Sequence, residues 1–239
     1  TGVSELLPGM VSSEHIIGGY WGGAVQIGAT KIKSMIIEIV DTAVLPKDLQ
    51  GDFLIAGYYA RNIARLRPSV NGSGHKLQTL APILTSSHNA FRPVDLNTGP
   101  DGALYVADWF NPIIGHYQAS LRHPDRDKKH GRIWRITAKG QSLLKPPALA
   151  EMKAVQLCNQ LAAPLRRTRQ LAKLRLMDLP KAEAIGAAQK WVDALKSTDP
   201  KLEAKLFEAI GVFESHEVVN RPLLERLLAA KDYRARAYA

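Results

Sequence analysis

The stretch FRPVDLNTGPDGALYVADWF, residues 91–110, combines two short apolar runs with a turn between them. The turn has recognisable chemistry, because Pro100 presets φ, Asp101 can bond the local main chain and Gly102 tolerates a positive φ. An apolar run on each side of such a turn predicts an antiparallel β-hairpin.

Charged residues stand at the two outer ends of this hairpin. Its strands are expected at 93–97 and 103–108, so that Arg92 precedes the first strand and Asp108 ends the second. Antiparallel pairing places these two ends side by side, opposite the turn. We therefore expect Arg92 and Asp108 on one face of the β region, together with the loops that open there.

The rest of residues 1–140 shows the same pattern of short strands between turns. Further strands are expected at KSMIIEIV (33–40), GDFLIAG (51–57), NIARLRP (62–68, ended by Pro68), LQTLAPIL (77–84) and RIWRIT (132–137). Many short strands separated by turn residues favour an all-β sandwich, barrel or propeller.

An internal repeat favours the propeller among these three. Asp52 precedes an apolar strand and Arg65 follows in the next strand, and Asp101 and Arg135 have matching places later in the chain. The spacing from Asp52 to Asp101 is about one propeller repeat, which runs roughly 40–50 residues. Four antiparallel strands per blade fit the number of expected strands. We predict that residues 1–140 form the C-terminal blades of a β-propeller.

Beyond residue 150 the apolar period changes to that of helices. Helices are expected within EMKAVQLCNQLA (151–162), PLRRTRQLAKLRLM (164–177), KAEAIGAAQKWVDALK (181–196), PKLEAKLFEAIGVFE (200–214) and RPLLERLLAAK (221–231). RTRQLA (167–172) recurs loosely as RARAYA (234–239), and an intermediate copy implies a period of roughly 35 residues. Paired helices with this period predict all-α HEAT-like repeats over 151–239. Residues 141–150, which include Pro146-Pro147, are expected to be a linker.

Composition narrows the classes of function. The chain has 239 residues, a net charge of +10 and one cysteine, Cys158. A single cysteine excludes an internal disulfide and a cysteine-based zinc site, and the CxxCH motif that attaches haem is absent from the sequence. A basic surface attracts nucleic acid, but aromatic residues do not alternate with the basic ones, so nucleic-acid binding is not expected. The sequence contains no run of about 18 apolar residues, so no transmembrane segment is expected in it.

The ends of the sequence suggest a piece of a longer protein. Thr1 begins in the middle of a pattern, and the last helical stretch lacks a stop signal. An incomplete propeller exposes the edges of its sheets. We therefore expect the chain to depend on missing N-terminal blades or on a partner chain.

Loops from neighbouring blades are expected to converge near Arg92 and to rim one pocket. The candidate residues of this rim are Arg61, Asn62, Asn89, Arg92, Asp108, Trp109 and His116.

The sequence leaves more than one role open for each titratable candidate residue. The guanidinium of Arg92 suits the carboxylate or phosphate of a ligand, and alternatively it pairs with Asp95 or Asp108 and holds the loop. Asp108 can accept a bond from a ligand, hold a cation or cap the loop, whereas His116 can be a base, a ligand-binding group or an anchor. The stretch HPDRDKKHGR (123–132) contains His and Asp, but its Lys and Arg residues oppose a cation, and no metal site is predicted.

The stretch FRPVDLNTGPDGALYVADWFNPIIGHYQ…HGRIWRIT (91–137) resembles the membrane-bound dehydrogenase propellers of multidomain bacterial proteins. These propellers are related to sorbosone dehydrogenase and to the soluble quinone-dependent glucose dehydrogenase, and HEAT repeats and a haem-c domain often follow them. The resemblance covers about 50–140 of the chain and extends weakly to 12–50 and to the helical part. Within 12–50, EHIIGGYWGGAVQIG (14–28) is similar to the Gly-rich start of a late blade.

This resemblance implies a quinone-dependent dehydrogenase that oxidises a sugar or an alcohol and passes electrons to a haem or membrane acceptor. It implies a pyrroloquinoline quinone at the channel mouth, where Arg92 matches an arginine that grips the quinone carboxylates. The other residues assigned to this cofactor site are Asp108, Trp109, His116, Arg61 and Asn62. A lysine that the relatives use in the preceding blade is replaced here by Tyr58-Tyr59-Ala60-Arg61. Catalytic residues of the relatives lie in earlier blades, so none is assigned.

The resemblance also implies a periplasmic protein in which haem c is carried by a cytochrome c domain outside this chain. A rival interpretation is a non-catalytic scaffold that binds protein or carbohydrate, because propellers and helical repeats both present large surfaces.

Overall fold

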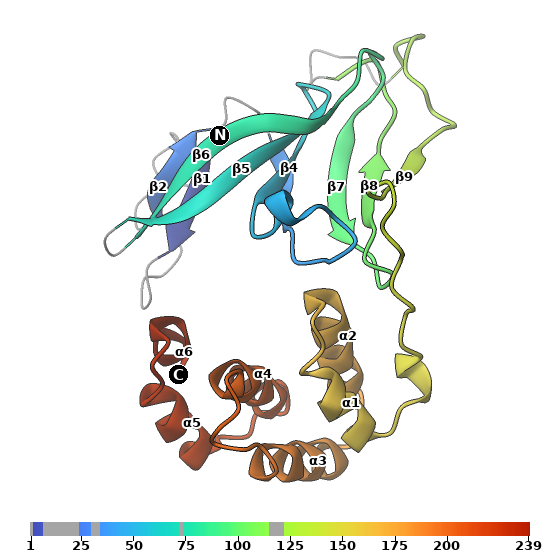
Figure 1. Cartoon of the computed structure of the whole chain (residues 1–239). Coiled ribbons are helices and arrows are strands. Elements are labelled where there is room, and N and C mark those ends of the chain that lie inside the picture. The colour runs from blue at the N-terminus through green and yellow to red at the C-terminus, as the bar shows by residue number, and fades with distance from the viewer. Residues whose placement is uncertain (1, 7–23, 30–33, 72–73, 115–121) are drawn as a thin grey trace. The chain divides into compact units, whose positions relative to one another are not determined.

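The structure is a computed structural model, and it describes residues 2–6, 24–29, 34–71, 74–114 and 122–239. The chain divides into two compact units, Thr1–Leu144 and Lys145–Ala239, which are called here the β unit and the α unit (Figure 1). In the described ranges, no helix has the length and apolar character needed to cross a membrane.

The described residues of the β unit form three antiparallel sheets. A pair of strands, β1 (Gly2–Leu6) and β2 (Ala24–Ala29), makes the smallest sheet. The two larger sheets are called here the first sheet, with the order β3–β4–β5–β6, and the second sheet, with the order β7–β8–β9. Their strands are β3 Ser34–Ile39, β4 Phe53–Gly57, β5 Asn62–Asn71, β6 Gly74–Thr85, β7 Pro93–Thr98, β8 Leu104–Asp108 and β9 Arg132–Ile136. These bounds confirm the strands expected from residue 33 onward, apart from the end of β5 and the start of β6, which begins at Gly74 instead of Leu77.

The prediction that Pro68 ends its strand is wrong, because β5 continues to Asn71. Pro68 pairs with Leu77 of β6, whereas β4 pairs with β5 only as far as Leu66. Beyond Leu66, β5 therefore has a strand neighbour on one side only among the described residues. Proline is tolerated at such an edge, since its missing N–H removes no bond on the open side.

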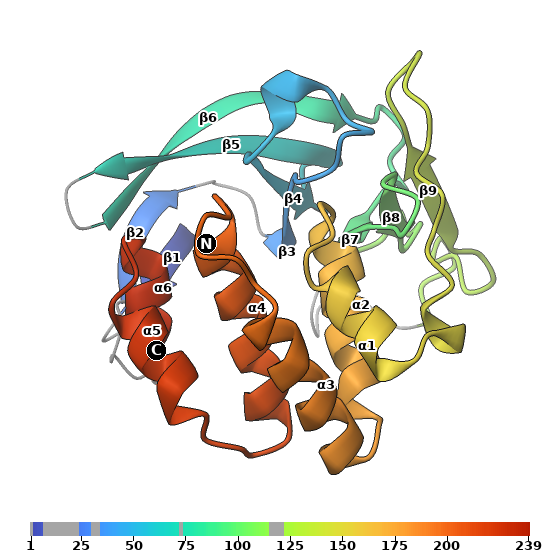
Figure 2. The ribbon, with the colours of Figure 1, turned by 60° about the horizontal axis from the view of Figure 1, so that its bottom comes forward.

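The first and second sheets pack against each other within the β unit. β7 lies against β3 and β4 (Figure 2). The apolar core between them contains Leu54 and Ile63 from the first sheet and Leu96, Leu104 and Val106 from the second. All five side chains are almost fully buried.

Polar bonds tie the sheets together at the end that carries the GPDG turn. Glu38 of β3 accepts hydrogen bonds from the backbone N–H and the hydroxyl of Thr98, at 3.2 and 2.7 Å. The hydroxyl of Thr42 donates to the carbonyl of Gly102 at 2.8 Å. Gly102 has φ +81, and a Cβ there would stand 2.6 Å from the Thr42 hydroxyl, so the turn needs glycine for both reasons.

The two sheets repeat one plan, as the sequence predicted. Asp52 precedes β4 and forms an ion pair at 2.5 Å with Arg65, which lies opposite Leu54 in the register. Asp101 precedes β8 and pairs with Arg135, which lies opposite Tyr105. The fold shown is therefore two related antiparallel sheets, of four and three strands. The described residues do not close into a ring of blades.

The α unit consists of six helices. They are α1 Ala154–Gln160, α2 Arg166–Met177, α3 Lys181–Asp193, α4 Leu202–Ser215, α5 Arg221–Leu228 and α6 Tyr233–Tyr238. Consecutive helices contact each other along the whole unit, α1 also contacts α3, and α4 also contacts α2 and α6 (Figure 2). Leu157, Cys158, Leu176, Phe213 and Leu227 belong to the shared core.

The loose sequence repeat in the α unit corresponds to a repeated hydrogen-bond pattern. Arg169 donates to the carbonyls of Ala163 and Pro164, which lie six and five residues before it, at 2.9 and 2.8 Å. Arg236 donates in the same way to residues 230 and 231, at 2.6 and 2.8 Å. Both arginines therefore fix the turn that precedes their own helix.

Candidate functional site

Arg92 stands immediately before β7, and its side chain is surrounded by main-chain carbonyls. The residue is only 6% exposed. Its Nε donates to the Asn111 carbonyl at 3.1 Å, and its Nη1 donates to the carbonyls of Tyr58 and Phe91, both at 3.2 Å. Its Nη2 donates to the carbonyl of Pro112 at 3.4 Å. The guanidinium thus joins the β4–β5 turn of the first sheet to the loop that follows β8 in the second.

Burial and a neighbouring charge both act on this guanidinium. Burial lowers the pKa of Arg92, and the positive charge of Arg61 lowers it further, although Asp108 opposes the shift. A buried cation needs strong hydrogen bonds to replace water. The four carbonyl acceptors supply them.

Asp108 ends β8 and holds the same loop through its carboxylate. Its Oδ1 accepts from the backbone N–H groups of Arg92 and Phe110, at 2.8 and 2.9 Å. Its Oδ2 accepts from the indole Nε1 of Trp134 at 3.0 Å. The backbone N–H of Trp109 also donates to the Arg92 carbonyl at 2.9 Å. Asp108 was expected to bind a ligand, hold a cation or cap the loop. These bonds show that it caps the loop.

The structure brings Arg92 and Asp108 together, but not as a side-chain ion pair. The guanidinium of Arg92 is bonded to carbonyls, and Asp108 bonds the main-chain nitrogen of Arg92 instead. Asp95 is also engaged elsewhere, because it accepts from the Leu96 N–H and from the Asn97 amide. Of the two interpretations left open for Arg92, the ion pair with Asp95 or Asp108 is not what the structure shows, but Arg92 does hold the loop, through main-chain carbonyls.

Arg61 and Asn62 lie at the β4–β5 turn, beside the Tyr58 carbonyl that Arg92 binds. Arg61 has φ +56, a left-handed conformation that side-chain-bearing residues rarely adopt, and its carbonyl accepts from the Ser86 N–H at 2.9 Å. Oδ1 of Asn62 is buried and has no hydrogen-bond partner in the structure. Backbone strain and an unpaired buried acceptor are features that concentrate at binding sites.

Two exposed aromatic residues lie close in the chain to groups that bond Arg92. Tyr59 is 45% exposed and Trp109 is 44% exposed. The rings of Tyr58 and Tyr59 lie 4.5 Å apart between centroids. His116, the remaining candidate of the cofactor site, lies outside the described residues, as does most of the Gly-rich stretch 14–28.

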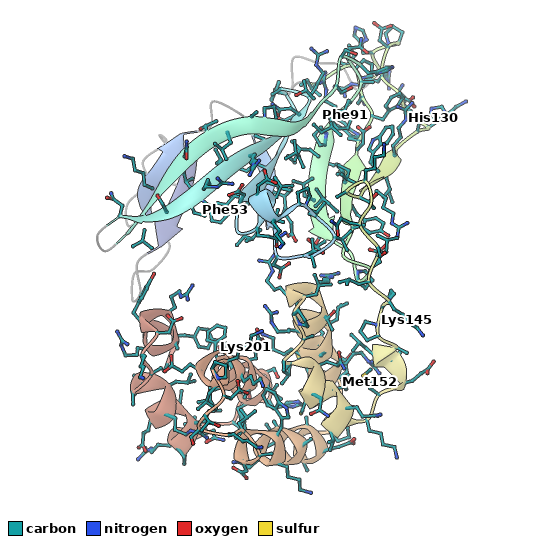
Figure 3. The ribbon with its side chains drawn as sticks, in the orientation of Figure 1. Phe53, Phe91, His130, Lys145, Met152 and Lys201 are labelled. Atoms are coloured by element: carbon teal, nitrogen blue, oxygen red, sulfur yellow. The ribbon has the colours of Figure 1, made fainter. Side chains whose placement is uncertain are left out.

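An open pocket of about 700 Å³ lies against this loop assembly. Its walls come from the loop before Arg92, from the loop after β8 and from residues 124–130. Asn89 lines it, as does Pro112, whose carbonyl binds Arg92. Phe91 and His130 lie at this same end of the second sheet (Figure 3). We call this end, with loops 57–62, 86–92 and 109–114, the loop end.

Sequence reasoning missed an aromatic stack in the wall of the pocket. The ring of His88 stacks on Phe110 at 5.4 Å, and the guanidinium carbon of Arg132 lies 3.5 Å from the centre of the Phe110 ring. Phe110 has φ +52, which turns the chain sharply after Asp108. The three residues are far apart in sequence, so no local sequence pattern predicts the stack.

The polar loop 123–130 folds around Asp127. The carboxylate of Asp127 accepts from the N–H groups of Lys129 and His130, both at 2.9 Å, and lies 2.8 Å from Nδ1 of His130. These bonds lower the pKa of Asp127. Among the residues that the structure describes, no group of three His, Cys, Asp or Glu side chains is placed to hold a metal.

Comparison with known proteins gives one family. Residues 33–140, which cover β3 to β9, match a family described as a domain of unknown function, DUF7133. Neither the curated proteins nor the solved structures give a match.

Proposed function

We propose that the β unit belongs to a β-propeller and that its loop end binds a sugar or a related alcohol. The observation that carries this proposal is the way Arg92 ties the β4–β5 turn to the loop after β8, whose Pro112 lines the open pocket. Small-molecule sites combine aromatic side chains with a few polar groups. Tyr59 and Trp109 supply exposed aromatic rings at the loop end, and Asn89 supplies an amide in the lining of the pocket.

The repeated plan of the two sheets supports the propeller. Each sheet has its Asp–Arg pair at the same place, and the sheets pack face to face with β7 against β3 and β4. Further sheets stacked in the same way would complete a ring with the loops of every blade at one mouth. The paired helices of the α unit and their repeated arginine support HEAT-like repeats.

A second candidate function is oxidation of the bound sugar or alcohol by the whole protein. The resemblance of 91–137 to dehydrogenase propellers favours it. The residues present do not fit the expected quinone at Arg92, however, because its guanidinium is buried and already bonded to four carbonyls. A quinone carboxylate would have to displace those carbonyls, so we assign no quinone to Arg92. In either function, Arg92 positions the loops.

Calorimetric titration with a panel of sugars and polyols tests the binding proposal. We expect saturable binding that Trp109→Ala weakens by about tenfold, because loss of an aromatic residue on which a ligand packs costs about 1 kcal/mol or more. Tyr233→Ala is the matched control, since Tyr233 is an aromatic residue of similar exposure in the α unit. Equal affinity in the wild type and Trp109→Ala would contradict a sugar site at the loop end.

Dye reduction distinguishes the two candidates. The protein is incubated with the sugar that binds best and with an artificial electron acceptor, with and without added pyrroloquinoline quinone. Sugar-dependent reduction of the dye supports oxidation. Saturable binding without dye reduction under either condition favours a carbohydrate-binding scaffold.

A further inference from the structure

The α unit contains a groove that no part of the proposed function uses. Its volume is about 460 Å³, and it is formed by the α1–α2 turn, the first half of α4 and the start of α6. Figure 3 shows Lys201, which lines the groove, at the start of α4. The groove runs across three successive helix pairs.

The inner surface of this groove is apolar. Leu161, Ala204, Phe207 and Ala235 contribute to it. Phe207 is held in place by the edge of the Tyr238 ring, at 4.6 Å between centroids. Ala204 is exposed and small, so it leaves room for a side chain from a ligand.

Positive charge exceeds negative charge around this apolar surface. Arg169 and Lys173 share one carboxylate, that of Glu208, at 2.8 and 2.7 Å. Arg236 bonds main-chain carbonyls close to the groove, and its charge also acts on the carboxylate of Asp232. Lys201 has no ion-pair partner within the described part of the chain.

The acidic residues of the groove are engaged by other groups. Both oxygens of Glu203 accept backbone N–H groups, from Lys231 at 2.7 Å and from Asp232 at 2.9 Å. Those N–H bonds lower the pKa of Glu203, which therefore stays ionised. Asp232 pairs with Arg234 at 2.6 Å. The α unit also has an excess of basic residues as a whole, with 17 Lys and Arg against 11 Asp and Glu in 141–239.

We infer that this groove binds an acidic peptide segment of a partner protein, with one apolar side chain of the peptide against Phe207 and Ala204. Complementary charge selects the partner and the apolar contact fixes its position. Nucleic acid would satisfy the charge, but the apolar inner surface favours a peptide side chain. The inference goes beyond sugar binding at the loop end and does not depend on it.

Fluorescence anisotropy with a labelled peptide in which glutamate alternates with leucine tests this inference. We expect saturable binding that weakens as salt is added. Lys201→Glu should weaken the binding by about tenfold, since it places like charges at the contact. Ala204→Trp should weaken it by at least as much, because the indole fills the groove without changing its charge.

Two controls separate this site from general charge attraction. Lys190→Glu changes the net charge equally on an exposed position of α3 outside the groove, and its affinity should stay within about twofold of the wild type. A peptide with glutamine in place of glutamate should bind weakly or not at all. Circular dichroism confirms that each variant is folded.

Three outcomes would overturn the inference. The first is an equal loss of affinity in Lys190→Glu and Lys201→Glu, and the second is unchanged binding in Ala204→Trp. The third is tighter binding of a labelled oligothymidine that depends on the same residues, which would assign the groove to nucleic acid.

Discussion

Ile133 of β9 occupies the place in the second sheet that Ile63 of β5 occupies in the first, yet Ile63 is fully buried and Ile133 is 78% exposed. Ile63 lies opposite Ala56, and Ile133 lies opposite Ala107. The difference arises because β6 and the second sheet cover β5, whereas β9 is the edge strand of the described second sheet. Identical residues at equivalent positions therefore contribute differently to stability.

Replacement of these two isoleucines by alanine should separate their contributions. Ile63→Ala should lower the free energy of unfolding by about 2–4 kcal/mol, because it leaves a cavity in the core between the sheets. Ile133→Ala should change it by about 0.5 kcal/mol or less, as for most surface substitutions. Urea denaturation followed by circular dichroism measures both. Equal losses in the two variants would show that Ile133 is covered in solution.

Arg92→Ala should destabilise the β unit by about 2–4 kcal/mol, because four buried or partly buried carbonyls lose their donor. Lys129→Ala, an exposed residue of the nearby loop, is the control and should be close to neutral. Denaturation midpoints of the two variants check this. A fully stable Arg92→Ala protein would mean that the guanidinium is free for a ligand.

The ion pairs of Asp52 predict that the stability of the fold depends on pH in the acidic range. Burial alone would raise the pKa of Asp52, but its bonds to Arg67 and Arg65 outweigh burial and lower the pKa below 3.8. The unfolded chain then binds the proton more tightly than the folded one. The ionised carboxylate therefore stabilises the fold above about pH 4, and this contribution is lost as the pH falls through the lowered pKa.

Asp52→Asn should accordingly be less stable than the wild type at neutral pH, and the gap should narrow below about pH 4. Thermal unfolding at a series of pH values gives the gap directly. Asp125→Asn, at an exposed carboxylate in the 123–130 loop, is the control and should show little effect at any pH. A constant gap down to the lowest pH would contradict the lowered pKa.

Cys158 should be unreactive in the folded protein. The thiol is fully buried in the helical core, and burial raises its pKa to about 11. Thiolate, the reactive form, is therefore scarce at pH 8. Reaction with an aromatic disulfide reagent should be slow in buffer and complete in denaturant. Rapid labelling under native conditions would show that α1 opens readily.

Much of the fold could be predicted from the sequence because its elements are local. Turn residues and apolar runs located the strands from residue 33 onward, and the matched Asp52–Arg65 and Asp101–Arg135 spacings correspond to ion pairs. Apolar periodicity located five of the six helices, and the loose repeat RARAYA indicated the sixth. Pro68 was misread because the open side of β5 depends on where β4 ends, which a single strand does not encode.

The candidate site was harder to predict, because its bonds join distant segments through the main chain. The positions of Arg92 and Asp108 at the two outer ends of one hairpin were enough to predict that they lie together. The partners of Arg92 are carbonyls, which every residue has, so no side-chain pattern reveals them. The stack of His88, Phe110 and Arg132 likewise depends on a left-handed turn at Phe110, a residue that rarely adopts one.

The most direct test of a sugar site at the loop end is a nuclear magnetic resonance titration of the labelled protein with the tightest-binding sugar. The proposal predicts saturable shifts concentrated at Tyr59, Asn89 and Trp109, with the α unit unchanged. Shifts confined to other parts of the chain, or no shift at the loop end when binding is saturated, would contradict it.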